Sequence, residues 1–184
     1  MNYSGKIRIS IKNVSFASCG YMYAVWLLPE ERDAEYLNRI IKNLSRLYGA
    51  PEFSSHVTVY GLVNAELELV EDAVKSSTIN LKPFTVRKSG IGYSGDIWKS
   101  LFINIELTPE LRLVNGRLTQ NLVHYHEYEF FPHISLIYKK IDEYEKRKII
   151  DRMKIKKEFI IDKIGILKFS ENIQDWEIIT ILRL

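Results

Sequence analysis

Two histidines in this sequence each stand two residues before a hydroxyl side chain. They are His56, followed by Thr58, and His133, followed by Ser135. Side chains alternate between the two faces of a β-strand, so in a strand each histidine and its hydroxyl would share a face, about 7 Å apart. An imidazole can both take and give a proton near neutral pH, and a hydroxyl can donate to an anionic oxygen. The two pairs therefore indicate acid–base chemistry beside a bound anion.

A single His-x-Ser/Thr pair is weak evidence, and two structural histidines are the alternative interpretation. Serine and threonine occupy about one position in eight of an ordinary protein, so two such pairs among four histidines arise by chance about one time in ten. Here both pairs lie in apolar, β-rich segments, with Gly61 following one and Tyr138 the other. We therefore interpret His56 and His133 as a catalytic pair.

Other chemistry-bearing residues give weaker signals. His124 and His126, followed by Glu127, lack a clear third metal ligand and a fixed second shell, which favours a solvated loop over a metal site. We expect no metal and no cofactor. Cys19 is the one cysteine, so no internal disulfide can form, and a reducing compartment is expected. Trp26 lies in an apolar run, where a tryptophan is more often core than ligand contact.

Length and composition indicate a soluble globular protein with one sizeable domain or two small ones that share a core. Because no linker divides the sequence, we expect a single domain, residues 1–184. The chain is 46% hydrophobic and 27% charged, as in ordinary globular proteins. It has no apolar run of the ~18 residues that a membrane span requires, and we expect a cytoplasmic monomer without membrane contact. The net charge of +3 is too small to indicate a nucleic-acid coat, although it allows a local positive patch for a phosphate.

The elements that must position the pairs can be predicted from periodicity and end signals. An apolar run at 21–28 predicts a buried strand, after which Pro29 opens a helix that ends at Gly49. A strand containing His56 ends at Gly61. The remaining predictions are strands at 6–12, 83–93, 98–107, 157–169 and 175–183, a strand containing His133, and helices at 66–77, from Thr108 through Leu122, and at 141–153. Gly90, Gly92 and Gly95 predict a turn between the strands at 83–93 and 98–107.

This order of elements contains a loose repeat. Strand, helix, histidine strand, helix and strand occur once in each half of the chain. Each half is too small to bury its own sheet well. Two halves packed about a pseudo-twofold axis would place the helices outside and bring the two histidine strands to face each other across a cleft.

Four segments resemble a known group, the 2H phosphoesterases, and within it the cyclic nucleotide phosphodiesterase (CPDase-like) family. Residues 23–29 (YAVWLLP) resemble the opening strand of that family, and residues 53–59 (FSSHVTV) and 132–138 (PHISLIY) its two signatures. Residues 175–177 (DWE) resemble its ending. The resemblance covers most of the chain, and residues 1–20 extend beyond the usual start of the family.

The resemblance implies an α+β, bilobal fold, with two pseudo-symmetric β-sheet lobes and outer helices around a central cleft. It implies metal-independent opening of 2′,3′-cyclic phosphates of nucleotides to 2′-phosphates, or of ADP-ribose 1″,2″-cyclic phosphate to the 1″-phosphate. His133 would act as the base and His56 as the acid, or the reverse. Thr58, Ser135 and Tyr138 would bind the phosphate.

Several features of the function stay open at this stage. Trp26 would stack on the base or sugar, and Tyr138 contributes only if its strand twists or ends there, because strict alternation turns it away from His133. A mononucleotide-sized substrate is favoured, with short RNA ends as a further candidate. The alternatives are cleavage of 2′,5′-linked or cyclic oligonucleotides, and a non-catalytic RNA-end-binding module.

Overall fold

A computed structural model of the protein describes residues 21–184. The strand predicted at 6–12 and the lone cysteine, Cys19, lie outside these residues. The strands are β1 (Met22–Pro29), β2 (Val57–Asn64), β3 (Phe84–Tyr93), β4 (Leu101–Ile105), β5 (His133–Ile137), β6 (Glu158–Phe169) and β7 (Glu177–Arg183). The helices are α1 (Glu31–Tyr48), α2 (Leu67–Ser77), α3 (Pro109–Leu122) and α4 (Glu143–Arg152), with short 3-10 turns η1 (Ile97–Lys99) and η2 (Ile173–Asp175).

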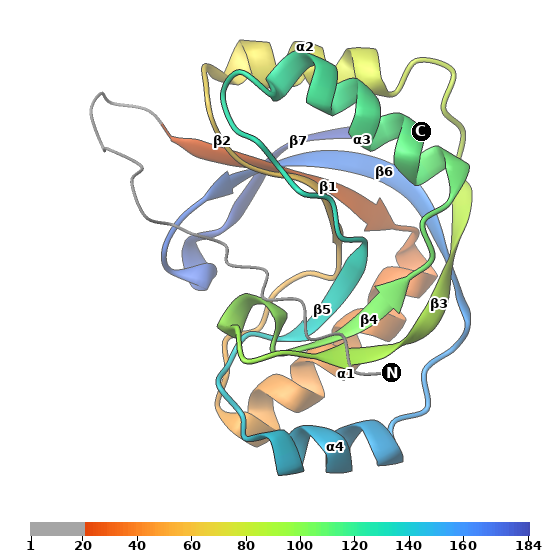
Figure 1. Cartoon of the computed structure of the whole chain (residues 1–184), viewed down its shortest axis with the longest axis vertical. Helices are drawn as coiled ribbons and strands as arrows, with labels where there is room; N and C mark the ends of the chain where they lie inside the picture. Colours follow the sequence, from red (N-terminus) through yellow and green to blue (C-terminus); the bar gives the residue numbers. More distant parts are fainter. Residues whose placement is uncertain (1–20) are drawn as a thin grey trace.

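The strands pair antiparallel in the order β2-β1-β6-β3-β4-β5, and β7 pairs with β6 along the edge that β3 also uses. Strand β3 connects the two parts of the sheet, because residues 84–87 pair with β6 and residues 88–93 pair with β4. In Figure 1, β1, β2, β6 and β7 lie in the upper part of the view and β4 and β5 in the lower part. The α+β class agrees with the prediction, and the antiparallel pairing of the strands is a finding of the structure.

The two halves of the chain exchange strands. Strand β6, from the second half, pairs with β1, and β3, from the first half, pairs with β4. The helices follow the same exchange, since α1 contacts β5 and α3 contacts β2. In Figure 1, α2 and α3 lie along the upper strands, and α1 and α4 along the lower ones. Each part of the sheet therefore gains apolar surface from both halves, and β2 contacts β5.

Local sequence determines where the long helices begin and end. The predicted opening of α1 at Pro29 is wrong, because Pro29 is the last residue of β1 and pairs with Ile161. The predicted C-cap is confirmed: Gly49 takes the left-handed conformation, with φ of 60°, which glycine adopts without a steric penalty. Helix α3 begins as predicted, because the Thr108 side chain accepts a hydrogen bond from the N–H of Leu111.

The segment between β3 and β4 differs from the prediction. Gly90 and Gly92 lie inside β3 and not in the turn. A Cβ at Gly92 would lie 2.6 Å from the Phe102 ring, so the small residue lets that ring lie across the strand. The strand predicted from residue 98 begins only at Leu101, and Trp98 belongs to η1. The turn is fixed by Asp96, whose carboxylate accepts a hydrogen bond from the N–H of Trp98 at 3.0 Å.

The core lies between the sheet and the helices. Helix α1 buries Leu37, Ile41 and Leu44, and α3 buries an apolar stripe that begins at Leu111, as the helical spacing predicts. The histidine strand β5 is buried along its whole length. Within residues 21–184, no helix combines the length and apolar character needed to cross a membrane.

Candidate active site

His56 and His133 hold their rings by the same local contact. His56 directly precedes β2 and His133 is the first residue of β5. In each ring Nδ1 lies 2.7 Å from the carbonyl oxygen two residues earlier, that of Ser54 or of Phe131. A carbonyl oxygen only accepts, so Nδ1 carries the hydrogen and Nε2 of the neutral ring keeps a free lone pair. Both imidazoles are therefore prepared to accept or return a proton through Nε2.

Burial controls the charge of both rings. It lowers the pKa of His56 to about 3, against the hydrogen bond to Ser54, and the charge of His133 lowers that pKa further. It lowers the pKa of His133 to about 4, against the hydrogen bond to Phe131, and the charge of Lys99 acts in the same direction as burial. The two strands that follow or carry these rings, β2 and β5, contact each other. Both are neutral at pH 7.

Acid is expected to destabilise the protein through these two histidines. The unfolded chain binds their protons near pH 6.5 and the folded protein only near pH 4 and below, so the free energy of unfolding falls as the pH falls from 6.5. Each ring contributes roughly 1.5 kcal/mol of that fall between pH 6.5 and 5. Urea unfolding at both pH values should show a smaller loss in His133→Gln. The exposed His124 provides the control, and an equal loss in His133→Gln and His124→Gln would contradict the expectation.

The two predicted hydroxyls have few competing partners. Thr58 is half-buried on β2, and its carbonyl oxygen accepts a hydrogen bond from the Tyr128 hydroxyl at 3.3 Å. Within residues 21–184 the Thr58 hydroxyl itself makes no hydrogen bond. The buried Ser135 hydroxyl donates to the Trp98 carbonyl at 3.3 Å, which is long for an O–H donor. Both hydroxyls can therefore turn to a bound anion at little cost.

Tyr138 reaches the site because its strand ends. β5 stops at Ile137, so strict alternation no longer applies to the next residue. The Tyr138 ring lies 4.1 Å from that of Phe53 and 5.5 Å from that of Trp98. Burial raises the pKa of Tyr138, so the phenol keeps its proton and can act as a donor.

An aromatic shell packs against His56, and other rings pack against His133. Trp26 is 3% exposed and stacks on His56, with ring centroids 3.4 Å apart and planes 5° from parallel. Trp176 contacts both Trp26 and Tyr138, and Phe102 lies edge-on to His133. The members of the shell are Trp26, Phe53, Trp98, Tyr138, Phe169 and Trp176. One face of Trp26 is thus covered by His56, whereas Trp98 and Trp176 are half-buried.

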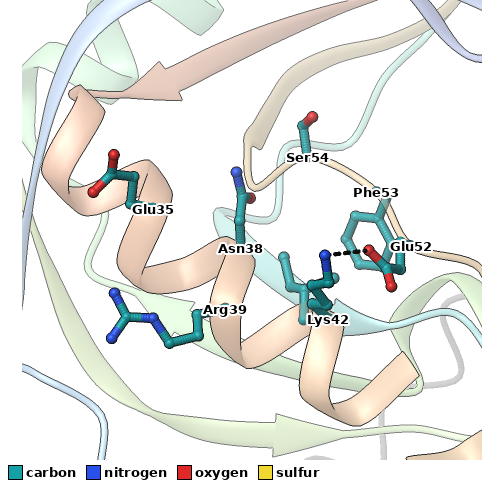
Figure 2. Close-up of a pocket in the computed structure, with 8 residues that line it drawn as sticks. Glu35, Asn38, Arg39, Lys42, Glu52, Phe53 and Ser54 are labelled. Atoms are coloured by element: carbon teal, nitrogen blue, oxygen red, sulfur yellow. Dashed lines mark ion pairs between the residues drawn. The ribbon is translucent and has the colours of Figure 1, made fainter. Parts of the chain in front are cut away.

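Both histidines are nearly buried: His56 is 4% and His133 9% exposed. A hollow of about 630 Å³ lies beside this site, between α1 and the loop before β2 (Figure 2). Its lining includes Asn38 and Ser54 but neither histidine. Asn38 accepts the N–H of Ser55 at 2.7 Å, so this hollow borders the outer side of the segment that holds His56.

The second histidine pair of the sequence, His124 and His126, follows α3. The carbonyl of His126 accepts a hydrogen bond from the hydroxyl of Tyr60 on β2. In the described part of the chain, no three His, Cys, Asp or Glu side chains gather as a metal site would require.

Sequence reasoning did not single out Phe53 or Lys99. Phe53 lies within the first signature, where its position three residues before His56 was an available signal.

Comparison with known proteins identifies the family. The family model of cyclic phosphodiesterase-like proteins matches residues 22–184. The chain belongs to this family. A cyclic phosphodiesterase of Arabidopsis thaliana is 23% identical over 126 residues, which are 68% of this chain and 70% of the plant protein.

Solved structures show the same fold at lower sequence identity. E. coli LigT complexed with 3′-AMP has a TM-score of 0.61 and 12% identity over 90% of this chain and 99% of LigT. LigT complexed with NADP⁺ has a TM-score of 0.57 and 14% identity over 91% and 99% of the two chains. At these identities the likeness establishes the fold: this member of the cyclic phosphodiesterase-like family has the α+β architecture of LigT, a 2H phosphoesterase.

Proposed function

We propose that this protein hydrolyses 2′,3′-cyclic phosphates of nucleotides to 2′-phosphates, or ADP-ribose 1″,2″-cyclic phosphate to the 1″-phosphate, without a metal. The observation that supports this most is the matched pair of imidazoles, His56 and His133, each with Nδ1 tied to a carbonyl and Nε2 free. In this proposal residues 1–184 form one domain. The upper and lower parts of the sheet are pseudo-symmetric lobes, and the substrate binds between them.

The proposed reaction is an in-line displacement at phosphorus. His133 Nε2 takes a proton from water as the water oxygen bonds to phosphorus. The bond from phosphorus to the ribose O3′ breaks, and O3′ takes a proton from the imidazolium of His56. Proton exchange with solvent then restores the starting state, and the reverse assignment uses the same two rings.

One of the two imidazoles must become protonated when the substrate binds. Both imidazoles are neutral at pH 7 in the free protein. A nearby phosphate anion raises the pKa of an imidazole, because opposite charge favours the protonated form. Substrate binding therefore creates the acid that the leaving oxygen requires.

The surrounding residues bind the phosphate, hold the His56 ring and stack on the base or sugar. Thr58, Ser135 and Tyr138 donate hydrogen bonds to the phosphate oxygens as negative charge develops. Trp26, stacked on His56 and buried, holds that ring in place. The half-buried Trp176 then takes the role of stacking on a base or sugar, which Trp26 was expected to fill.

Substrate access requires the aromatic shell to open, since the histidines are nearly buried. A nucleotide-sized ligand agrees with the 3′-AMP and NADP⁺ complexes of LigT, which shares the fold.

A product assay tests the proposal. The protein incubated with 2′,3′-cyclic AMP in EDTA should yield 2′-AMP, as measured by phosphorus NMR, and a His56→Gln/His133→Gln variant serves as the blank. Turnover of 2′,5′-linked or cyclic oligonucleotides alone would replace the proposed substrate. Absence of any turnover, with tight RNA binding that weakens steeply with salt, would identify a binding module instead.

A further inference from the structure

Lys99 is fixed next to the histidine of β5. It is the last residue of η1, and its carbonyl accepts a hydrogen bond from the Ser94 hydroxyl at 2.9 Å. The preceding carbonyl, that of Trp98, accepts the hydroxyl of Ser135. Hydrogen bonds thus connect the turn to Ser94, at the start of its loop, and to the strand that carries His133.

The ammonium of Lys99 has no counter-ion in its surroundings. Within residues 21–184 no carboxylate forms an ion pair with it and no acceptor forms a hydrogen bond with it. It lies 5.1 Å from the centre of the Phe131 ring, whose carbonyl holds His133. Burial lowers the pKa of Lys99, and the more distant charges of Asp96 and Glu129 oppose that effect.

A partly buried cation without a partner is unfavourable in the free protein. The Phe131 ring that Lys99 covers lies 5.4 Å from the His133 ring, and the charge of Lys99 lowers the pKa of His133. The other polar groups beside the phosphorus position of the proposed reaction are neutral at pH 7: two imidazoles, two hydroxyls and a phenol. The site that these groups form therefore lacks a charge to match an anionic substrate, except at Lys99.

We propose that Lys99 binds the reacting phosphate from the side of β5 and is the permanent positive charge of the site. The proposal rests on the proposed function for the identity of the phosphate. A cyclic phosphate carries one negative charge, and the ring-opened product approaches two at neutral pH. Since the anion gains charge along the reaction, a fixed cation stabilises the later states more than the bound substrate.

The same charge affects His133. Without an anion, burial and, to a smaller extent, the charge of Lys99 keep this imidazole neutral, which leaves Nε2 free to accept a proton from water. Once the phosphate is bound, its negative charge offsets that of Lys99, and the ring can hold the proton that it takes. Three other charged or titratable groups are coupled to Lys99 or His133. Asp96 and Glu129 raise the pKa of Lys99, and the charge of His133 lowers the pKa of His56.

Kinetics of three lysine variants test the proposal. Lys99→Met should lower kcat/KM for 2′,3′-cyclic AMP by roughly 10- to 100-fold, the effect of losing a hydrogen bond to a charged group. Lys99→Arg should recover most of the loss because it restores the charge. Lys168→Met is the matched control, since Lys168 also lies over an aromatic ring, 3.5 Å from the centre of Tyr21, and should leave the rate unchanged.

Two measurements without turnover separate this proposal from the proposed function. The pKa of His133, followed by proton NMR, should rise in Lys99→Met and stay low in Lys99→Arg, which a merely structural lysine would not cause. Calorimetric binding of 2′-AMP should weaken in Lys99→Met and not in Lys168→Met. Both results, in a protein that turns over no cyclic phosphate, would support the Lys99 site while overturning the proposed reaction.

Two outcomes would overturn the role of Lys99. The first is normal turnover and 2′-AMP binding by Lys99→Met, with an unchanged pKa of His133. The second is a defect confined to substrates that carry another phosphate, such as ADP-ribose 1″,2″-cyclic phosphate. That result would place Lys99 beside a remote phosphate and not beside the reacting one.

Discussion

Replacing His133 by glutamine is expected to lower kcat/KM for 2′,3′-cyclic AMP by about 10²–10⁴-fold, and His56→Gln should cost a similar factor. Glutamine keeps a side chain of comparable length that can donate to the Phe131 carbonyl, as Nδ1 of His133 does. It has no nitrogen that accepts and returns a proton near neutral pH. The loss therefore isolates proton transfer from packing.

The double variant makes the expectation sharper. Two residues that serve one displacement act as a unit, so His56→Gln/His133→Gln should be little worse than either single change. Initial rates measured by phosphorus NMR or chromatography give the comparison. His124→Gln provides a control outside the site. Single variants that keep wild-type rates, or losses that multiply in the double variant, would argue against a shared reaction centre.

Local patterns in the sequence were enough to predict the histidine pairs and much of the secondary structure. The period of a strand places His133 and Ser135 on one side of β5, and cap chemistry located Gly49 and Thr108 at helix ends. The contact from each ring to the carbonyl two residues earlier is also local. Its geometry depends on backbone angles at the start of the strand, which the residue types do not specify.

Features that depend on contacts between distant segments could not be predicted from local sequence patterns. The exchange of β3 and β6 between halves is a choice among antiparallel partners with similar apolar patterns, so the sequence alone favours no pairing. Trp98 accepts a hydrogen bond from Ser135, and Lys99 lies over the Phe131 ring, only because the chain turns at η1 before β4. The stacking of Trp26 on His56 required the register of β1 against β2, which pairs Trp26 with Thr58.

Ser135→Ala is expected to lower kcat/KM by about 10²–10³-fold, the range found when one preorganised donor is removed from a reaction centre. The hydroxyl lies in a buried position beside His133, and its contact with the Trp98 carbonyl is long enough to yield to a phosphate oxygen. If the bond to phosphate forms mainly as charge develops, kcat should fall while KM changes little.

Ser77→Ala is the matched control for this change. Ser77 is also buried and donates to a backbone carbonyl, that of Val74 at 2.8 Å, but it lies in α2. Both variants remove one hydroxyl and one hydrogen bond to a carbonyl, so we expect a similar loss in the free energy of unfolding. Only Ser135→Ala should also lower kcat. Urea unfolding measures that loss directly. An unchanged kcat in Ser135→Ala would show that the Ser135 hydroxyl has no catalytic role. Its function would then be the hydrogen bond to the Trp98 carbonyl.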